Sequence, residues 1–335
     1  MKVIKVISFL FIVFHSFVAW GQDPSMTQFY MMPTLLNPAY TGLMEQYVRI
    51  NTNYRTQWNK FAPYYTYAAS VDGAIVDNKQ EGGDYFGLGV AALHDKPDSG
   101  LTSSMLNLSA SFHKQIKELP RHNLSVGIRL SAGQRMLDNR DLWYGTYWTE
   151  NNNYDPMMTS NFERVSIVDF SAGLMYSIVA KNKHNMNFGF AIDHITRPNL
   201  AFLSSHEDKL YRKMSIHYNA EQILLNVDNR NNAWGIAPKL LMEFQGPHKR
   251  MSIGNLFKYI MNVTGNISIS TGGIYRLSNN LDNTFKGESM AFVLQFEYNN
   301  VFFGYSHDFN TVNFKNLYGE VHGNELSIII NFSNY

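Results

Sequence analysis

The chain contains no cysteine and carries almost no net charge. Without cysteine, a disulfide framework, a thiol nucleophile and a lipid anchor on an N-terminal cysteine are excluded. Its 28 basic and 27 acidic side chains give a formal net charge of +1. Proteins that bind nucleic acid carry a basic patch or stripe, and a near-neutral chain gives no sign of one. We therefore expect no nucleic-acid partner.

Long apolar runs are also missing after residue 21. A helical membrane span needs about 18 or more consecutive apolar residues, and the mean hydropathy of the chain is only -0.25. Residues 1–21 follow the order of a secretory signal peptide: Lys2 and Lys5, the apolar stretch Val6–Trp20, and small residues at Ala19 and Gly21. We expect cleavage before Gln22. A membrane anchor is the alternative, for which this stretch is short.

The chain is rich in apolar residues that alternate with small or polar ones. In residues 123–133, the apolar positions are Leu124, Val126, Ile128, Leu130 and Ala132. The positions between them are occupied by Ser125, Gly127, Arg129, Ser131 and Gly133. Since successive side chains of a strand point to opposite faces, one face is apolar and the other polar. This pattern is typical of a transmembrane β-barrel, which has lipid outside and a polar lumen inside.

The same alternation recurs along residues 47–335 and predicts an all-β fold, a transmembrane antiparallel β-barrel of about fourteen strands. The expected strands are Tyr47–Tyr54, Tyr65–Val71, Phe86–Ala92, Met105–Phe112, Asn123–Gly133, Val168–Ile178, Asn187–Ile195, Met214–Ala220, Trp234–Met242, Met251–Ile260, Ile267–Tyr275, Met290–Tyr298, Val301–Asp308 and Leu326–Phe332. Long connections alternate with short ones; the long ones are Met136–Val165, Arg197–Lys213, Ser278–Glu288 and Asn310–Gly323. Outer-membrane barrels have short periplasmic turns and long outer loops. We therefore expect an outer-membrane protein with these four connections outside the cell.

The predicted barrel contains a proline within a strand and several charged residues at inward positions. Pro238 falls within the ninth strand and cannot donate to its ladder, so it predicts a bulge or a locally open edge. Charged side chains of both signs occupy inward positions: Asp72, Arg129, Asp169, Asp193, Lys239 and Glu297. We expect them to form a hydrogen-bonded network that fills the lumen. A conductive pore lined by these charges is the alternative.

Catalytic residues are sparse. Acidic and histidine side chains gather in two expected outer loops: Asp141, Asp155 and Glu163 in the first, and His206, Glu207 and Asp208 in the second. Outer-membrane proteases use Asp and His pairs on such loops, but acid-rich loops are ordinary solvated surface. We therefore expect no catalytic residue, no metal site and no cofactor, and predict that the protein is not an enzyme.

The alternation of apolar and polar residues that predicts the strands does not account for residues 28–42. They read Gln-Phe-Tyr-Met-Met-Pro-Thr-Leu-Leu-Asn-Pro-Ala-Tyr-Thr-Gly. This stretch resembles the opening signature of the PorP/SprF family of type IX secretion membrane proteins, and its most specific positions are Asn37, Pro38, Ala39, Tyr40 and Gly42. An aromatic-Arg-x-Gln-Trp motif that resembles the family's next signature places Arg55, Gln57 and Trp58 at the first hairpin. The end of the chain, Glu325–Phe332, resembles the family's closing strand.

The resemblance implies a Bacteroidota outer-membrane barrel that helps a specific secreted surface protein, often a large adhesin, to reach or stay on the cell surface. The implied partners are a secreted protein with a type IX C-terminal domain, other type IX secretion components and outer-membrane lipid. Protein secretion and gliding motility are the associated processes. A general porin or uptake channel, and an outer-membrane hydrolase, are the competing hypotheses.

We expect residues 22–46 to form an N-terminal segment that packs at the periplasmic mouth or enters the lumen. Pro38 fixes its own φ and biases Asn37 towards extended geometry, and Gly42 allows a turn before the first strand. We favour a structural cap over a partner-docking site for this segment. For docking, the candidate is the longest outer loop, whose aromatic side chains are Trp143, Tyr144, Tyr147, Trp148 and Tyr154.

Overall fold

The computed structural model describes most of the chain. The described residues are 23–58, 62–75, 83–98, 100–119, 121–138, 163–179, 184–202, 205–226, 232–261, 267–279, 283–310 and 322–333. Among these residues, no helix is both long enough and apolar enough to span a membrane.

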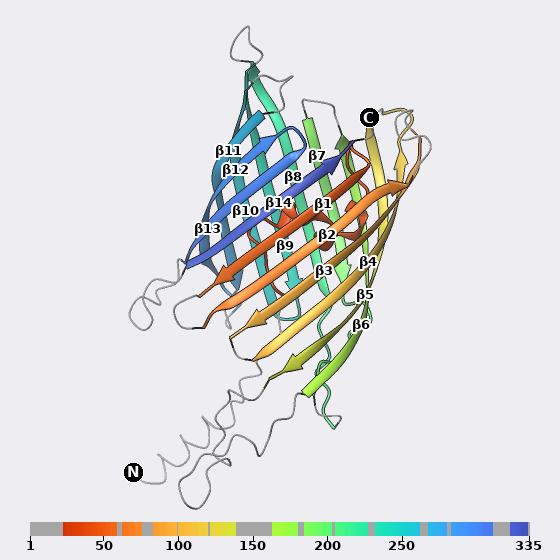
Figure 1. Ribbon diagram of the computed structural model, residues 1–335, viewed down its shortest axis with the longest axis vertical. Helices are drawn as coiled ribbons and strands as arrows, with labels where there is room; N and C mark the ends of the chain where they lie inside the picture. The colour runs from red at the N-terminus through yellow and green to blue at the C-terminus, as the bar shows by residue number, and fades with distance from the viewer. Residues whose placement is uncertain are drawn as a thin grey trace, which may run out of the picture.

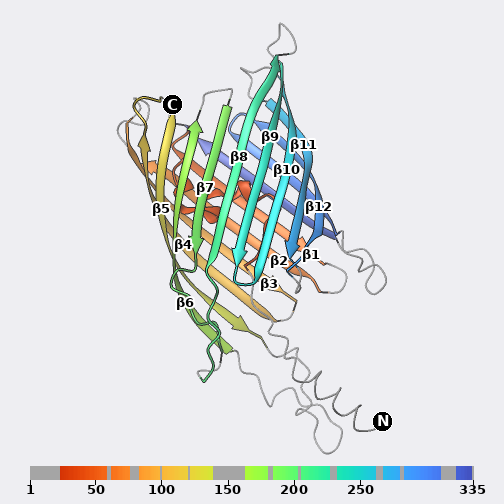
Figure 2. The same cartoon turned by 180° about the vertical axis from the view of Figure 1, so that it is seen from behind.

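The described residues form fourteen antiparallel strands that close into a barrel, with β1 paired to β14. The strands are β1 (Val48–Gln57), β2 (Tyr64–Ile75), β3 (Tyr85–Pro97), β4 (Leu101–Gln115), β5 (His122–Leu137), β6 (Glu163–Val179), β7 (His184–Asp193), β8 (Lys213–Asn226), β9 (Ala233–Gln245), β10 (His248–Met261), β11 (Ile267–Asn279), β12 (Phe285–Tyr298), β13 (Val301–Asn310) and β14 (His322–Phe332). Each strand pairs with its neighbour in sequence, as Figures 1 and 2 show from two sides. The fold class and the number of strands predicted from the alternation are confirmed.

The two faces of the wall follow the alternation. Ile128 and Leu294 are 51% and 43% exposed and point outward. The residues next to Ile128 in sequence, Gly127 and Arg129, are buried on the inner face. An apolar outer face and a polar inner face place the hydrophobic boundary between protein and lipid on the outside of the barrel.

The ends of the barrel differ in the length of their connections. At one end β1 begins and β14 ends, and the connections there are short, for example between β4 and β5 and between β12 and β13. We call it the short-turn end. The other, the long-loop end, carries the connections 138–162, 194–212 and 311–321. The predicted parity is not complete. At the long-loop end, β9 and β10 are joined by a tight turn through Gly246, whose φ is +57°, and β3 and β4 by residues 98–100. The connection expected to be long at Ser278–Glu288 is also short, because β11 ends at Asn279 and β12 begins at Phe285.

Pro238 opens the ladder where expected. On one side β9 keeps its register with β10, where Pro238 faces Asn255. On the other side the pairing with β8 runs to Asn219 opposite Lys239 and resumes only at Gln222 opposite Ile236. The missing N–H of proline explains why this gap lies beside β8.

The N-terminal segment runs inside the barrel. It forms three short helical turns, η1 (Phe29–Met31), α2 (Pro33–Leu36) and η2 (Pro38–Tyr40). In both views these red turns lie within the ring of strands. Nearly all residues from Thr27 to Met44 are buried, so the segment, and not side chains alone, occupies the lumen.

Candidate functional site

Asn37 fixes the N-terminal segment to the barrel wall at mid-height. Its side-chain oxygen accepts a hydrogen bond from Ala39 N at 2.9 Å and so caps η2, which begins with Pro38. Its amide nitrogen donates to the main-chain oxygens of Leu174 and Phe190 at 3.1 and 3.3 Å. A capping asparagine followed by proline starts a helical turn with little loss of freedom. This one side chain therefore both shapes the turn and attaches it to β6 and β7.

Tyr40 and Gly42 complete the same attachment towards the short-turn end. The ring of Tyr40 is buried and stacks on the ring of His217, with 5.2 Å between centroids. Gly42 has a φ of +72°, and its N–H donates to Asp72 Oδ2 at 2.8 Å. The same carboxylate pairs with Arg49 at 2.7 Å. The turn predicted at Gly42 is present.

Glycines in the wall make room for the signature residues. A Cβ added to Gly127 of β5 would lie 2.4 Å from Ala39 N, and one added to Gly173 of β6 would lie 1.9 Å from Asn37 Oδ1. Both distances are far inside van der Waals contact. The inward glycines of the alternation are therefore the seat on which residues 37–39 lie.

Nearer the long-loop end, one carboxylate holds the backbone of the segment. Glu325 of β14 accepts hydrogen bonds from the N–H groups of Thr27 and Gln28 at 2.7 and 3.0 Å, and from Asn53 Nδ2 at 2.8 Å. All four residues are buried. Charge-assisted bonds to a buried carboxylate are among the stronger hydrogen bonds, so Glu325 fixes the height of the segment in the lumen.

Arg55 ties this clamp to the wall. It pairs with Asp308 at 2.7 Å and lies 3.7 Å from the Glu325 carboxylate. It also donates to the main-chain oxygen of Ser25. Arg276 adds a second guanidinium, which donates to Thr27 Oγ1 at 2.8 Å. The charges of this cluster are balanced, as buried ions require.

The other two residues of the second motif lie elsewhere. Gln57 is the last residue of β1, and Trp58 follows it, 42% exposed, with an edge-on contact to the ring of Tyr64. Of the predicted signature residues, Arg55 thus binds the N-terminal segment, and the segment itself contributes Asn37, Pro38, Ala39, Tyr40 and Gly42. Gln57 and Trp58 lie at the long-loop rim and do not take part.

The start of the segment is held at the long-loop mouth by charged groups. His194 lies 2.9 Å from Asp23 and 2.5 Å from Asp169, and Lys213 lies 2.6 Å from Asp23. Burial alone would lower the pKa of His194, but Asp23 and Asp169 outweigh it and raise the pKa to about 9. Burial would raise the pKa of Asp23, but His194 and Lys213 hold it well below 3.8. The cluster is therefore ionised at neutral pH.

The inward charges named from the sequence are buried or partly buried, as predicted, but several bind the segment as well as each other. Arg129 donates to the main-chain oxygens of Thr34 and Leu35, both at 2.9 Å, and pairs with Asp193. Lys239 lies 4.5 Å from the ring centroid of Tyr30. In the part of the chain that is described, no group of three or more His, Asp or Glu side chains is arranged to hold a metal ion.

Comparison with known families decides the identity of this barrel. The model of the type IX secretion system membrane protein family PorP/SprF matches residues 18–328. The chain belongs to the PorP/SprF family. It is therefore an outer-membrane barrel of the type IX secretion system. The family consists of secretion-system membrane proteins and is not a family of enzymes.

Solved structures with a similar fold are distant from this PorP/SprF member. A Pseudomonas aeruginosa FadL homologue has 12% identity and a TM-score of 0.45, over 88% of this chain and 93% of that one. The monoaromatic hydrocarbon channel CymD has 12% identity and a TM-score of 0.47, over 91% and 93%. The P. putida toluene transporter TodX has 10% identity and a TM-score of 0.47, over 90% and 94%. No curated protein sequence matches the chain.

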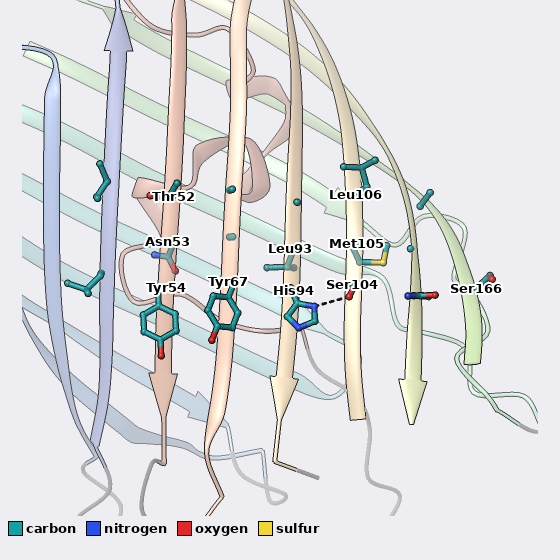
Figure 3. Close-up of a pocket in the computed structure, with 18 residues that line it drawn as sticks. Thr52, Asn53, Tyr54, Tyr67, Leu93, His94, Ser104, Met105, Leu106 and Ser166 are labelled. Carbon is teal, nitrogen blue, oxygen red and sulfur yellow. Dashed lines mark hydrogen bonds between the residues drawn. The ribbon is translucent and has the colours of Figure 1, made fainter. Parts of the chain in front are cut away.

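Figure 3 shows a groove of about 960 Å³ on the outside of this PorP/SprF barrel. A row of polar side chains crosses its wall from strand to strand, with Tyr54, Tyr67, His94, Ser104, Gln134 and Ser166 in register. His94 Nδ1 and Ser104 Oγ lie 2.8 Å apart. Small side chains such as Ala69 and Ala92 form the adjoining row and make the wall hollow there. The groove belongs to the outer surface and not to the lumen.

Sequence reasoning missed Glu325, Asp308 and Arg276 as binders of the segment. The available signal was their inward position in the alternation. Charged side chains that point inward from nearby strands at a similar height are expected to form a cluster. The five aromatic residues proposed for docking, between 143 and 154, lie outside the described residues.

Proposed function

We propose that this PorP/SprF barrel holds one secreted surface protein, or a small set, at the cell surface and acts with other type IX secretion components. The observation that carries the proposal is the occupied lumen. A general channel requires an open path, whereas this segment crosses the lumen from the mouth at Asp23 to the turn at Gly42, and nearly all of its residues from Thr27 to Met44 are buried.

The segment is held by side chains distributed around the barrel. The segment contacts Glu325 of β14 and Arg129 of β5, and its own Asn37 binds β6. These strands come from both halves of the chain. A segment attached at so many points stiffens the wall and is costly to remove. This favours a rigid platform that binds a protein over a pore that opens for solutes.

The proposed partner is a secreted protein with a type IX C-terminal domain; membership of a type IX secretion family supports this choice because such proteins are what the system exports. For the contact surface we propose the aromatic residues of the connection between β5 and β6. Large aromatic side chains at a protein surface are frequent anchors of binding energy. Long connections of outer-membrane barrels face outward, which would place these residues where a surface protein lies.

The test is deletion of the gene followed by protease shaving of whole cells and mass spectrometry of the released peptides. The proposal expects one surface protein, or a few, to disappear while general permeability is unchanged. Gliding on agar, where the strain glides, is scored in the same strains. An unchanged surface proteome would refute the proposal. High conductance of the purified barrel in planar bilayers, independent of any partner, would place it among the porins instead.

A further inference from the structure

Strand β6 has a free edge at the long-loop end. It pairs with β5 along its whole length, from Glu163 opposite Leu137 onward. Its pairing with β7 begins only at Ala172, opposite Ile192. In Figures 1 and 2 the start of β6 extends past the end of β7. Among the described residues, the stretch from Glu163 to Val168 therefore has a strand on one side only.

The contacts beside this edge show which backbone groups face the gap. Ile195 N donates to Phe170 O at 3.0 Å, and Thr196 Oγ1 lies 3.5 Å from Val168 O. In a strand, the backbone groups of alternate residues point to the same side. The N–H and C=O groups of Arg164 and Ser166 hence point to the open side as well. Both residues are exposed, and in Figure 3 Ser166 lies at the end of the row.

A cavity of about 350 Å³ adjoins the inner face of this edge. Ile167 of β6 lines it, together with Leu200 and Leu210 of the connection between β7 and β8. On the side of the N-terminal segment, Phe29 and Met32 line it. These residues form the apolar part of the cavity wall, which also contains charged side chains such as Asp23, Arg129, Asp169 and Lys213. The cavity lies where the inward side chains of a strand added to β6 would point.

We propose that the free edge of β6 and this cavity form the binding site for an extended segment of the surface partner. The segment adds a strand beside Glu163–Val168, and one or two of its alternate, apolar side chains enter the cavity. The inference deepens the proposed function and rests on it.

The chemistry favours a polypeptide in extended form over other ligands. Unpaired N–H and C=O groups in a row are a template for another strand. Strand addition takes its affinity from main-chain hydrogen bonds and its specificity from pockets for alternate side chains. Both components are present side by side at β6. An acyl chain or a small apolar solute would use the cavity but would leave the backbone groups of Arg164 and Ser166 unpaired.

The test uses one substitution on each component. Ser166→Pro removes an N–H that faces the gap and leaves the ladder to β5 intact, the placement in which proline is tolerated on an edge strand. Ser166→Ala keeps the N–H and is the matched control. Ser103→Phe places a ring into the cavity, whose wall includes Ser103. Heat-modifiable migration on gels reports that each variant still forms the barrel.

We expect Ser166→Pro to reduce the amount of partner retained on cells by about two- to tenfold, the effect of one lost hydrogen bond. Ser103→Phe should reduce it as well, because the added ring occupies the space that a side chain of the partner would enter. Ser166→Ala should retain it as the parent does. Amide hydrogen exchange of residues 163–168 should be slower in the complex purified from outer membranes than in barrel from a strain lacking the partner. Unchanged retention and exchange in folded Ser166→Pro would overturn the inference.

Failure of this inference is distinct from failure of the proposed function. If deletion removes the surface protein but folded Ser166→Pro retains it fully, the barrel anchors its partner elsewhere. If only Ser103→Phe has an effect, the cavity accepts a side chain or a solute without strand addition, and the inference is equally wrong.

Discussion

Replacing Asn37 with alanine should free the N-terminal segment from the lumen. The change removes the cap of η2 and the hydrogen bonds of the Asn37 amide nitrogen to two main-chain oxygens of the wall, at 3.1 and 3.3 Å. The same nitrogen lies 3.0 Å from His217 Nε2, so its two hydrogens are shared among three acceptors. A lost cap costs about 1 kcal/mol and each lost hydrogen bond about 1 kcal/mol more, so the total is about 3 kcal/mol. An equilibrium shifts tenfold per 1.4 kcal/mol, and we therefore expect release of the segment to become roughly a hundredfold more frequent.

Thiol labelling can measure this release. Thr34 is only 2% exposed on the segment, and the natural chain has no cysteine, so Thr34→Cys supplies a single buried thiol. A maleimide can reach it only when the segment leaves its seat. The labelling rate of the folded barrel in detergent therefore reports the opening equilibrium. In the Asn37→Ala background this rate should rise about a hundredfold, in proportion to that equilibrium.

The control is Gln57→Ala in the same cysteine background. Gln57 belongs to the sequence signature but ends β1 at the long-loop rim, so its loss should leave the labelling rate unchanged. A rate in Asn37→Ala within about threefold of the parent, less than ~0.7 kcal/mol, would show that the contacts of Asn37 do not hold the segment. In that case the seat of the segment is set by other residues.

Three further outcomes are expected. Glu325→Ala should raise the labelling rate of the same thiol at least as much, because two buried backbone N–H groups lose their acceptor; a slower rate would contradict the clamp. Ile128→Arg should cost roughly 2–4 kcal/mol of unfolding free energy in lipid, measured in urea, and Ser131→Arg less; equal costs would mean that the faces are misassigned. The effect of His194→Asn, as the ratio of labelling rates to the parent, should be largest between pH 3.8 and 6.5, where Asp23 is ionised and His194 is protonated even outside the folded cluster. It should decline above pH 6.5 and vanish as the pH rises through about 9, where the folded protein loses the His194 proton. It should also decline as the pH falls well below 3.8, where Asp23 gains a proton in the folded protein; a ratio independent of pH would exclude the ion pair as the cause.

Alternation predicted the wall because it is a local property that repeats. Lipid on one side and a polar interior on the other act on every second residue, so all fourteen strands could be found, and Pro238 marked a gap in the β8–β9 ladder. The register shift between Ile223 and Leu225 of the same ladder had no such signal. The strands are longer than expected at the long-loop end. At that end the strands extend beyond the apolar band, and their outward positions are polar, as at Gln134 and Ser166. The alternation of apolar and polar residues is therefore lost there.

The contents of the lumen were harder to predict. Thr27 and Glu325 meet across almost the whole chain, and no periodicity connects residues so far apart. The segment itself has no regular period, because each of its residues faces a different part of the wall. Only the signature at Asn37 and Tyr40 indicated that the segment is more than a linker, and it indicated neither its path nor its partners.

The path of the N-terminal segment restricts the order of assembly. Asp23 lies at the long-loop mouth, whereas β1 begins at the opposite end, so the chain traverses the lumen before it builds the wall around it. The residues that grip the segment near Thr27 come from β1, β11, β13 and β14, the strands on both sides of the β1–β14 seam. The ring of strands therefore closes around the N-terminal segment of its own chain. A folded domain placed ahead of Asp23 would have to cross a closed lumen or be present on the outer side before closure, so N-terminal fusions should arrest this barrel at the step that joins β1 to β14.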